Sequence, residues 1–321
     1  MSVLFLTESD VESLIDMPSS IEVVERAFAA LADGSAVNVP RARASAPGFL
    51  LHSMSATAEY LGVAGWKNYT TTTAGARFHV ALYDLHSGRM LALIQANRLG
   101  QLRTGAASGV ATRHLARTDA TSMALLGTGW QAESQLEAVT CVRRLETVRV
   151  YSRDPAKRQL FAETMGQRLG LDIQAVDSAD AAVRDSEIVS TATTAREPLF
   201  DGRLLTAGSH LNIIGSNHLS KSESDVESIA VASTVACDRI DQCRLEAGEL
   251  VDAVASRRWK WEQAIELADI VAGTHIGRTD DAERTVFKSV GLAVEDVAMA
   301  AELITRARDR GVGQAIPLDV D

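Results

Sequence analysis

The first part of the chain has the hydrophobic pattern of a helix. Apolar residues recur there every three or four positions, at Ile21, Val24, Phe28 and Leu31. This spacing predicts helix over residues 7–33. Thr7 and either Ser19 or Ser20 are the candidate N-terminal caps. Gly34 is the expected stop.

Between residues 37 and 94 the pattern changes to short apolar runs separated by glycine and polar clusters. The runs are Phe49–Leu51, Leu61–Ala64, Val80–Tyr83 and Met90–Ile94. Such runs predict a β-meander. A helix over residues 101–115 is expected next, and apolar positions at helical spacing predict another over about 292–311.

Strands and helices alternate in the rest of the chain. The expected strands cover residues 122–126, 147–151, 172–176, 187–192, 210–214 and 231–237. A helix over 155–169 begins at Pro155, a residue favoured in the first helical turn. This alternation predicts an α/β fold, with a Rossmann-type, doubly wound sheet over residues 119–291. Residues 1–118, together with 292–321, are expected to form an α+β domain.

Composition and charge disfavour several classes of protein, among them nucleic-acid-binding, membrane-spanning and disulfide-rich proteins. The net charge of −10 disfavours nucleic acid or an anionic membrane as a partner. No run approaches the roughly 20 apolar residues that cross a bilayer, and the N-terminus lacks a signal-peptide pattern. The three cysteines, Cys141, Cys237 and Cys243, have no CxxC spacing, which disfavours disulfides and a zinc site. We therefore expect a cytoplasmic protein without a metal.

One segment has the pattern of a dinucleotide-binding turn. A buried strand is expected up to Leu126, followed by Gly127 and Gly129 in a tight turn. Ala132 is the small residue of the next helix. In such a turn the backbone approaches a pyrophosphate, and the helix N-terminus offers N–H groups and a positive dipole end. The same pattern occurs in tight turns of other α/β proteins, so the motif alone leaves both interpretations open.

The strand after this turn bears on the choice of dinucleotide. Ser152 follows that strand at the position where NAD enzymes carry an acidic residue. Arg153 is placed to pair with a 2′-phosphate, which favours NADPH. Asp154 is a ribose ligand if the register is shifted, so NADH is the alternative.

The first half of the chain carries four candidate cations for a site, Arg41, Arg43, Lys67 and Arg103. Lys67 lies in a strand-like run, where a charge must find a partner or face a pocket. Arg103 is expected at the start of a helix, where guanidinium and helix dipole act together on a carboxylate. Each alone is more often a surface charge, and His52 is more often a core or turn residue than a catalyst.

Two segments of the second half resemble site loops rather than plain structure. Residues 211–218 form a strand that ends in a small, polar turn containing Asn217. In open α/β sheets the carboxyl ends of strands border the ligand crevice. Residues 287–291 precede the last helix and are placed to close the same crevice.

Together these segments resemble the ornithine cyclodeaminase/mu-crystallin family over nearly the whole chain. The resemblance is carried by Val39–Arg41, Lys67, Leu102–Ala107, Gly127–Gln131, Gly215–Asn217 with Lys221 and Glu223, and Phe287–Asp296. The last of these segments is the most specific.

The resemblance implies a homodimer whose N-terminal domains pair through their sheets, and a nicotinamide dinucleotide on the Rossmann domain. The substrate would be a small α-amino or α-imino acid, with its carboxylate held by residues like Arg41, Lys67 and Arg103. Val290 is a further expected substrate contact. The expected cofactor contacts are Gly127, Thr128, Gly129, Trp130, Gln131, Ser152, Arg153, Thr193 and Ser289. Lys67 and Asn217 are the expected catalytic residues.

Two departures from the family pattern bear on the reaction. Asn217 stands where cyclodeaminases have an aspartate that handles the amine, and an amide can neither take up a proton nor balance an ammonium charge. His52 falls near the place of a second carboxylate of those enzymes. Both changes favour NAD(P)H-dependent reduction of an α-imino acid to the L-amino acid, reversible as an amino-acid dehydrogenase. A cyclodeaminase that recycles NAD and a non-catalytic NADPH-binding protein are the alternatives.

The identity of the imino acid stays open at this point. Arg43 and His52 are spare polar groups that would suit a second carboxylate, as in iminosuccinate, a substrate known in this family. Cyclic imines such as pyrroline-2-carboxylate and piperideine-2-carboxylate are the other candidates.

Overall fold

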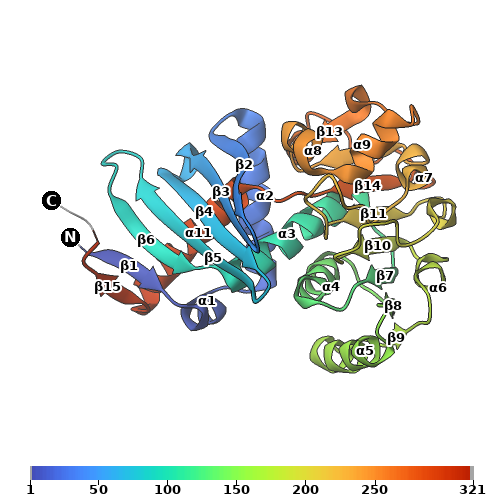
Figure 1. The fold of residues 1–321 in the computed structure, drawn as a ribbon, viewed down its shortest axis with the longest axis horizontal. Helices are drawn as coiled ribbons and strands as arrows, with labels where there is room; N and C mark the ends of the chain where they lie inside the picture. The colour runs from blue at the N-terminus through green and yellow to red at the C-terminus, as the bar shows by residue number, and fades with distance from the viewer. Residues whose placement is uncertain (1, 319–321) are drawn as a thin grey trace. The chain divides into compact units, whose positions relative to one another are not determined.

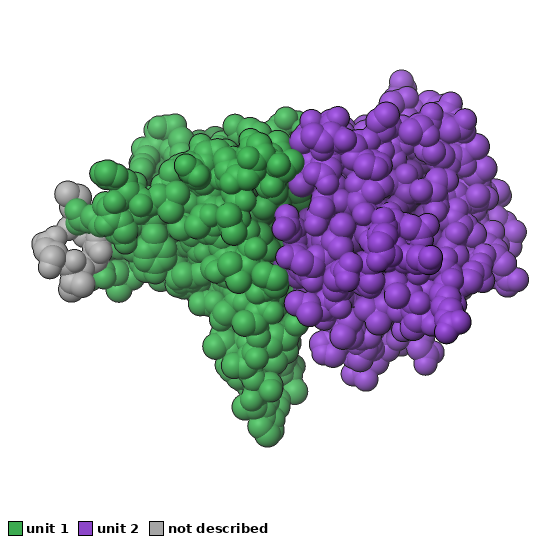
Figure 2. Space-filling view, turned by 90° about the horizontal axis from the view of Figure 1, so that it is seen from above, with its two compact units in different colours: residues 1–103, 292–321 green, residues 104–291 purple. Residues whose placement is uncertain are grey.

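The computed structural model describes residues 2–318, and the chain divides into two compact units (Figure 2). Unit 1 is Met1–Arg103 with Leu292–Asp321, and unit 2 is Thr104–Gly291. The first boundary therefore falls at residue 103 and not at 118 as expected. It lies within helix α3 (Asn97–Leu115), whose residues from Thr104 onward belong to unit 2. There the Gln135 side chain donates to the Thr104 carbonyl.

In the described residues, unit 1 has a seven-stranded sheet in the order β15–β1–β6–β5–β4–β3–β2 (Figure 1). Its strands are β1 (Val3–Leu6), β2 (Ala36–Ala46), β3 (Phe49–Ala58), β4 (Val63–Thr72), β5 (Gly75–Asp84), β6 (Met90–Gln95) and β15 (Gln314–Ile316). Its helices are α1 (Glu8–Leu14), α2 (Met17–Asp33), η1 (Glu59–Leu61) and α11 (Ala293–Arg310). Strands β2 to β6 pair antiparallel, so the predicted meander is confirmed.

The helical prediction for residues 7–33 is confirmed, except at the break formed by residues 15 and 16. The structure has two helices there, because Asp16 accepts from the Ser19 N–H and starts α2 anew. Ser19 and Ser20 are thus inside the second helix and do not cap it, while Thr7 caps the first as expected. Strand β1 was not predicted, since its pairing with β6 is set by tertiary structure.

Helix α11 packs on one face of the unit 1 sheet, mainly against β3 and β4. Side chains alternate between the faces of a strand, and β4 follows this rule, with alternate positions buried. Gly65 on β4 permits the close packing, because a Cβ there would lie 2.5 Å from the Ala81 carbonyl oxygen and 3.0 Å from Val297. The face that carries Lys67 and Tyr69 is therefore the helix-covered face.

The start of helix α3 was also misplaced. The helix begins at Asn97 and not at residue 101, so Arg103 lies in its second turn. The Glu8 carboxylate accepts from the N–H groups of Asn97 and Arg98 at 2.7 and 2.9 Å and closes the helix N-terminus. The proposed action of the helix dipole with Arg103 is therefore wrong.

Unit 2 has, in the described part of the chain, an eight-stranded parallel sheet in the order β13–β12–β14–β11–β10–β7–β8–β9. Its strands are β7 (Ser122–Leu126), β8 (Thr147–Tyr151), β9 (Ile173–Ala175), β10 (Ile188–Thr191), β11 (His210–Ile213), β12 (Thr234–Cys237), β13 (Ala264–Glu266) and β14 (Thr285–Lys288). Its helices are α4 (Trp130–Val142), α5 (Pro155–Leu169), α6 (Ala179–Val183), η2 (Gly202–Leu204), α7 (Val226–Ala230), α8 (Ile240–Glu246), α9 (Gly248–Ala255), η3 (Trp261–Gln263) and α10 (Leu267–Val271).

The Rossmann-type prediction for this unit is confirmed. Strand order reverses between β7 and β10, which is the switch point where ligands bind in doubly wound sheets. Apolar clusters fill the layers on the two faces of the sheet. Strand β14 was not predicted, although it lies in the middle of the sheet between β11 and β12. Across residues 2–318, the helices fall short of the length and apolar character needed to cross a membrane.

Candidate active site

Three of the expected substrate-binding cations lie in unit 1. Lys67 on β4 pairs across the sheet with Met54 on β3. Arg41 on β2 falls at a bulge, because the register of β2 against β3 shifts between Val39 and Ala42. Such a bulge re-aims a side chain, and Arg41 is 8% exposed although the positions around it are more open.

Two buried acids of α11 hold two of these cations. Lys67 Nζ donates to Asp296 Oδ1 at 2.7 Å. Arg103 Nη1 donates to Glu295 Oε2 at 2.8 Å, and its Nε lies 3.3 Å from the same Asp296 oxygen. Gly100 on α3 leaves room for the ammonium, since a Cβ there would lie 3.3 Å from Lys67 Nζ. Sequence reasoning quoted Glu295 and Asp296 only as part of a motif and gave them no role.

The environment changes the acidity of Lys67. Burial, followed by the charge of Arg103, lowers the pKa of Lys67 to about 8, although Asp296 opposes this shift. Burial also disfavours the charged form of Arg103, but Asp296 and Glu295 outweigh it and raise the pKa of Arg103. Arg103 is therefore a fixed positive charge, whereas Lys67 can exchange a proton close to neutral pH.

His52 on β3 borders this cluster. Its ring stacks on Tyr69, with centroids 3.9 Å apart, and its Nε2 lies 3.4 Å from Thr71 Oγ1. Burial, followed by the charges of Arg41 and Arg43, lowers the pKa of His52 to about 4, so the ring is neutral at pH 7. His52 is 5% exposed and its Nδ1 has no hydrogen-bond partner among the described residues. His52 is therefore a buried residue, but one of its ring nitrogens is left for a further hydrogen bond.

The glycine turn of unit 2 has the geometry that a pyrophosphate requires. Gly127 has φ 120°, and a Cβ there would lie 2.4 Å from the Ala192 carbonyl oxygen, so only glycine fits. A Cβ on Gly129 would meet nothing within 4 Å, so the backbone is open to a ligand at this point. Helix α4 begins directly afterwards at Trp130. The residues present therefore fit a dinucleotide phosphate at a helix N-terminus.

The three residues after β8 differ in whether their side chains are already engaged in hydrogen bonds or are open to a dinucleotide. Ser152 Oγ accepts from Thr128 Oγ1 at 3.1 Å, so the glycine turn after β7 is joined to the loop after β8. Asp154 caps α5, with its Oδ1 accepting from the N–H groups of Ala156 and Lys157. Arg153 is exposed. The carboxylate that would select NADH is thus engaged by the helix.

Other expected site residues of unit 2 follow neighbouring strands. Thr193 comes after β10, Asn217 after β11, and Ser289 and Val290 after β14. Because β10, β11 and β14 are parallel neighbours, these residues lie at the same edge of the sheet as the glycine turn.

Sequence reasoning missed the buried side chains that hold these loops. Asp238, after β12, accepts through Oδ2 from Ser289 Oγ, Val290 N and Gly291 N at 2.9, 2.7 and 2.7 Å. The Ser289 hydroxyl is thereby committed to Asp238. An aspartate that follows a predicted strand was the available signal for this role. Among residues 2–318, no group of three or more acidic, His or Cys side chains is placed to hold a metal ion.

Comparisons of the sequence and of the structure with known proteins all identify relatives in one family. The sequence model of the ornithine cyclodeaminase/mu-crystallin family matches residues 1–311. A Δ1-pyrroline-2-carboxylate reductase of Bacillus cereus is 38% identical over 238 residues, which are 74% of this chain and 73% of that protein. The structure of the Thermococcus litoralis Δ1-pyrroline-2-carboxylate reductase with NADH and L-proline is 35% identical, with TM-score 0.94 over 98% of this chain and 100% of that one. An archaeal alanine dehydrogenase dimer with bound NAD is 30% identical, with TM-score 0.93 over 99% and 100%.

Proposed function

Because the chain belongs to the ornithine cyclodeaminase/mu-crystallin family, we propose that it reduces a small α-imino acid to the L-amino acid with NADH or NADPH. The reaction is reversible as an amino-acid dehydrogenation. The observation that carries this proposal is the buried pair of cations, Lys67 and Arg103, held by Asp296. A fixed guanidinium and an ammonium with a pKa of about 8 suit a carboxylate and a proton transfer next to it.

Each group has a defined task in this proposal. Arg41 and Arg103 bind the substrate carboxylate, and Lys67 both binds it and gives a proton to the imine nitrogen. When bound, the reduced nicotinamide supplies a hydride to the C=N carbon. The carbon gains a hydride and the nitrogen a proton, so the imine becomes an amine. Asn217 orients the imine nitrogen through its side-chain amide.

A cyclodeaminase is the second candidate, and it needs a different group at residue 217. Ring closure with loss of ammonia requires a carboxylate that takes up a proton from the amine, and an asparagine amide does not do this at neutral pH. Neutral His52 likewise carries no negative charge for a side-chain ammonium. Both residues favour the reductase.

Among imino acids, a cyclic imine such as pyrroline-2-carboxylate is our first choice. The reductases of Bacillus cereus and Thermococcus litoralis that resemble this chain are named for this substrate. Iminosuccinate is the second choice, because the Nδ1 of His52 is buried without a hydrogen-bond partner in the described structure and Arg43 lies near the ring. A second carboxylate would accept a hydrogen bond from the Nδ1–H of His52 and would be attracted by the positive charge of Arg43.

The test is oxidation of NADPH and NADH by the purified protein with a panel of imines. The panel contains preformed pyrroline-2-carboxylate and piperideine-2-carboxylate, and 2-oxo acids with ammonia or methylamine. We expect turnover with at least one member. Dinucleotide binding without turnover on any imine would reject the reductase in favour of a binding protein. Ammonia release from ornithine without net NADH change would support the cyclodeaminase.

The dinucleotide preference gives a prediction of its own. We propose that Arg153 pairs with a 2′-phosphate and makes NADPH the better donor. Arg153→Ala should lower the ratio of kcat/KM for NADPH to that for NADH about tenfold, the value of one exposed charge-assisted hydrogen bond. Arg149→Ala is the control, because Arg149 lies on β8, just before Arg153, but donates to the Arg184 carbonyl. An unchanged ratio in Arg153→Ala would exclude the assigned contact.

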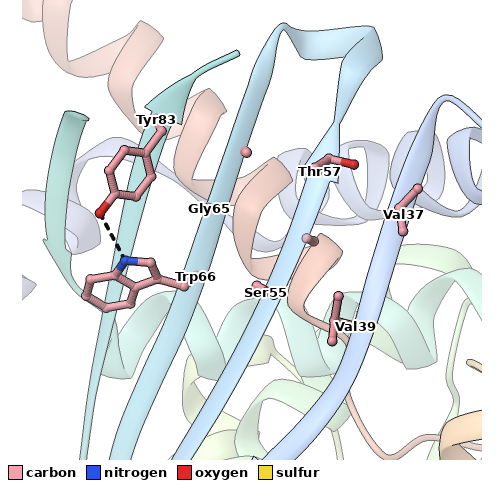
Figure 3. Close-up of a pocket in the computed structure, with 9 residues that line it drawn as sticks. Val37, Val39, Ser55, Thr57, Gly65, Trp66 and Tyr83 are labelled. Atoms are coloured by element: carbon pink, nitrogen blue, oxygen red, sulfur yellow. Dashed lines mark hydrogen bonds between the residues drawn. The ribbon is translucent and has the colours of Figure 1, made fainter. Parts of the chain in front are cut away.

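We also propose that the chain forms a homodimer through the open face of the unit 1 sheet. A shallow hollow lies there, lined by Val37, Val39, Ser55, Ala56, Thr57, Ala64, Gly65, Trp66 and Tyr83 (Figure 3). Val37 and Val39 on β2 are 56% and 49% exposed, so two valines of the sheet face the solvent side by side. The dimeric alanine dehydrogenase similar to this chain supports a second copy as the occupant.

Val39→Asp should convert the dimer to a monomer. A two-fold interface contains each residue twice, so a single substitution buries two carboxylates and raises the dimer dissociation constant by at least about a hundredfold. Sedimentation at micromolar concentration measures the change. Leu160→Asp is the matched control, since Leu160 is 63% exposed but lies on α5 of unit 2. A Val39→Asp protein that stays dimeric would contradict this assignment.

We further propose that the protein acts in the cytoplasm. Cys141, Cys237 and Cys243 are present as thiols rather than disulfides in the described chain, which suits a reducing compartment. Fractionation of the expressing cell tests this proposal.

A further inference from the structure

We propose that Lys288 and Glu223 are positioning residues for the reaction, Lys288 through Asn217 and Glu223 through Thr193. The inference rests on the proposed function and adds two side chains that contact neither substrate nor cofactor in it. Both are buried within unit 2.

Glu223 ties the ends of strands β10 and β11 together. Its Oε1 accepts from the N–H and the hydroxyl of Thr193 at 2.6 and 2.7 Å. Its Oε2 accepts from Gly215 N at 2.6 Å and from Thr191 Oγ1 at 2.9 Å. All four partners are placed to donate, and an ionised carboxylate can accept from all of them. Burial raises the pKa of Glu223, and the charge of Lys288 together with these hydrogen bonds opposes the rise.

The two loops that Glu223 joins are also in direct contact. A Cβ on Gly215 would lie 2.3 Å from the Thr193 carbonyl oxygen and 2.4 Å from its nitrogen. Only glycine allows this approach. The loop that carries Thr193 and the loop that carries Asn217 therefore cannot move independently.

Lys288, the last residue of β14, fixes the next part of the Asn217 loop. Its Nζ donates to the Ser216 carbonyl oxygen at 2.7 Å and lies 3.3 Å from Glu249 Oε2. Glu249 Oε1 in turn accepts from Glu223 N at 3.0 Å. One connected set of buried charges thus holds the loops after β10 and β11 and anchors them to the end of β14.

The bond to Ser216 acts on Asn217 through covalent geometry. The Ser216 carbonyl belongs to the planar peptide group that joins Ser216 to Asn217. Holding its oxygen fixes the plane of this group, and with it the direction in which the Asn217 side chain leaves the backbone. A displacement of about 1 Å at a reacting group can cost roughly a hundredfold in rate. Lys288 therefore supports kcat, whereas Glu223 supports cofactor binding through Thr193.

A double-mutant cycle on kcat tests this role, with NADH and pyrroline-2-carboxylate as probes. The variant Lys288→Met/Glu249→Gln removes the charge pair together, and the glutamine oxygen still accepts from Glu223 N. We expect kcat to fall about 30-fold while the Kd of NADH changes less than about threefold. In an Asn217→Ala background the same pair of changes should lower kcat by no more than about twofold. Lys288 acts through the Asn217 side chain, which is absent in this background.

Arg143→Met is the matched control for loss of a buried cation. Arg143 donates to the carbonyls of Thr112, Ala116 and Arg117, away from the strand-end loops. It should lower the melting temperature, leave kcat within about twofold and be additive with Asn217→Ala. Lys288→Arg should restore part of the lost kcat, since it keeps a charged donor.

Two results would overturn the inference. One is a folded Lys288→Met/Glu249→Gln protein with kcat near that of the unmodified chain, and the other is full additivity with Asn217→Ala. If the variant does not fold, Glu223→Gln is tested instead. The glutamine amide N–H would then face hydrogen-bond donors. Glu223→Gln should raise the Kd of NADH by a larger factor than it lowers kcat. The activity of the unmodified protein is measured before that of any variant. If the unmodified protein reduces no imine, the proposed function itself is rejected.

Discussion

Replacement of Lys67 by methionine is expected to lower kcat/KM for imine reduction about a thousandfold. General acid catalysis by a positioned group contributes roughly 10²–10⁴-fold, and the lost ammonium also weakens carboxylate binding. Methionine has a similar length and leaves no large cavity. Steady-state rates with NADH or NADPH and the best imine of the panel measure the effect. A loss of only a few-fold would show that Lys67 has no role in proton transfer.

The pH dependence of the same reaction distinguishes the two tasks of Lys67. Reduction requires the protonated ammonium, so kcat/KM should fall as the pH rises through the pKa of Lys67, about 8. Oxidation of the amino acid requires the neutral amine, and its kcat/KM should rise through the same pKa. In Lys67→Arg the positive charge persists at all pH values of the assay, so both inflections should disappear. Profiles that are flat between pH 6.5 and 9.5, on the order of one and a half units either side of this pKa, would contradict the assignment.

Replacement of Asp296 by asparagine is expected to have the largest effect on stability. The carboxylate contacts both Lys67 and Arg103, and all three side chains are buried. Removing one partner of a buried ion pair typically costs about 3–5 kcal/mol, because the remaining charge is left uncompensated. Chemical denaturation measures the change in the free energy of unfolding.

Two further variants separate charge compensation from other causes of this loss. Asp201→Asn breaks an exposed pair with Arg203 and should leave the unfolding transition where it is. Lys67→Met/Asp296→Asn removes both charges and should be more stable than Asp296→Asn alone. If the double variant is as unstable as the sum of the single changes, the buried pair does not explain the loss.

The sequence by itself determined the local elements of unit 2 and the place of the cofactor turn. Strands β7 and β8 and helix α5 have the predicted bounds, because apolar runs, Pro155 and the Asp154 cap are local signals. The glycine turn was also predicted from the sequence, and the backbone geometry at Gly127, with φ 120° and no room for a Cβ, requires glycine there.

Contacts between residues far apart in the sequence decided the rest. The start of α3 depends on the Glu8 carboxylate, which lies 89 residues before Asn97, and no local pattern near the helix contains this cap. The acidity of Lys67 depends on Asp296, 229 residues later, and on Arg103. The loops that carry Thr193 and Asn217 are likewise held by Glu223, 30 residues after Thr193, and by Lys288, 72 residues after Ser216. Periodicity reports only which face of an element is apolar, whereas a buried charge is fixed by its partner, and tertiary structure alone brings the partners together.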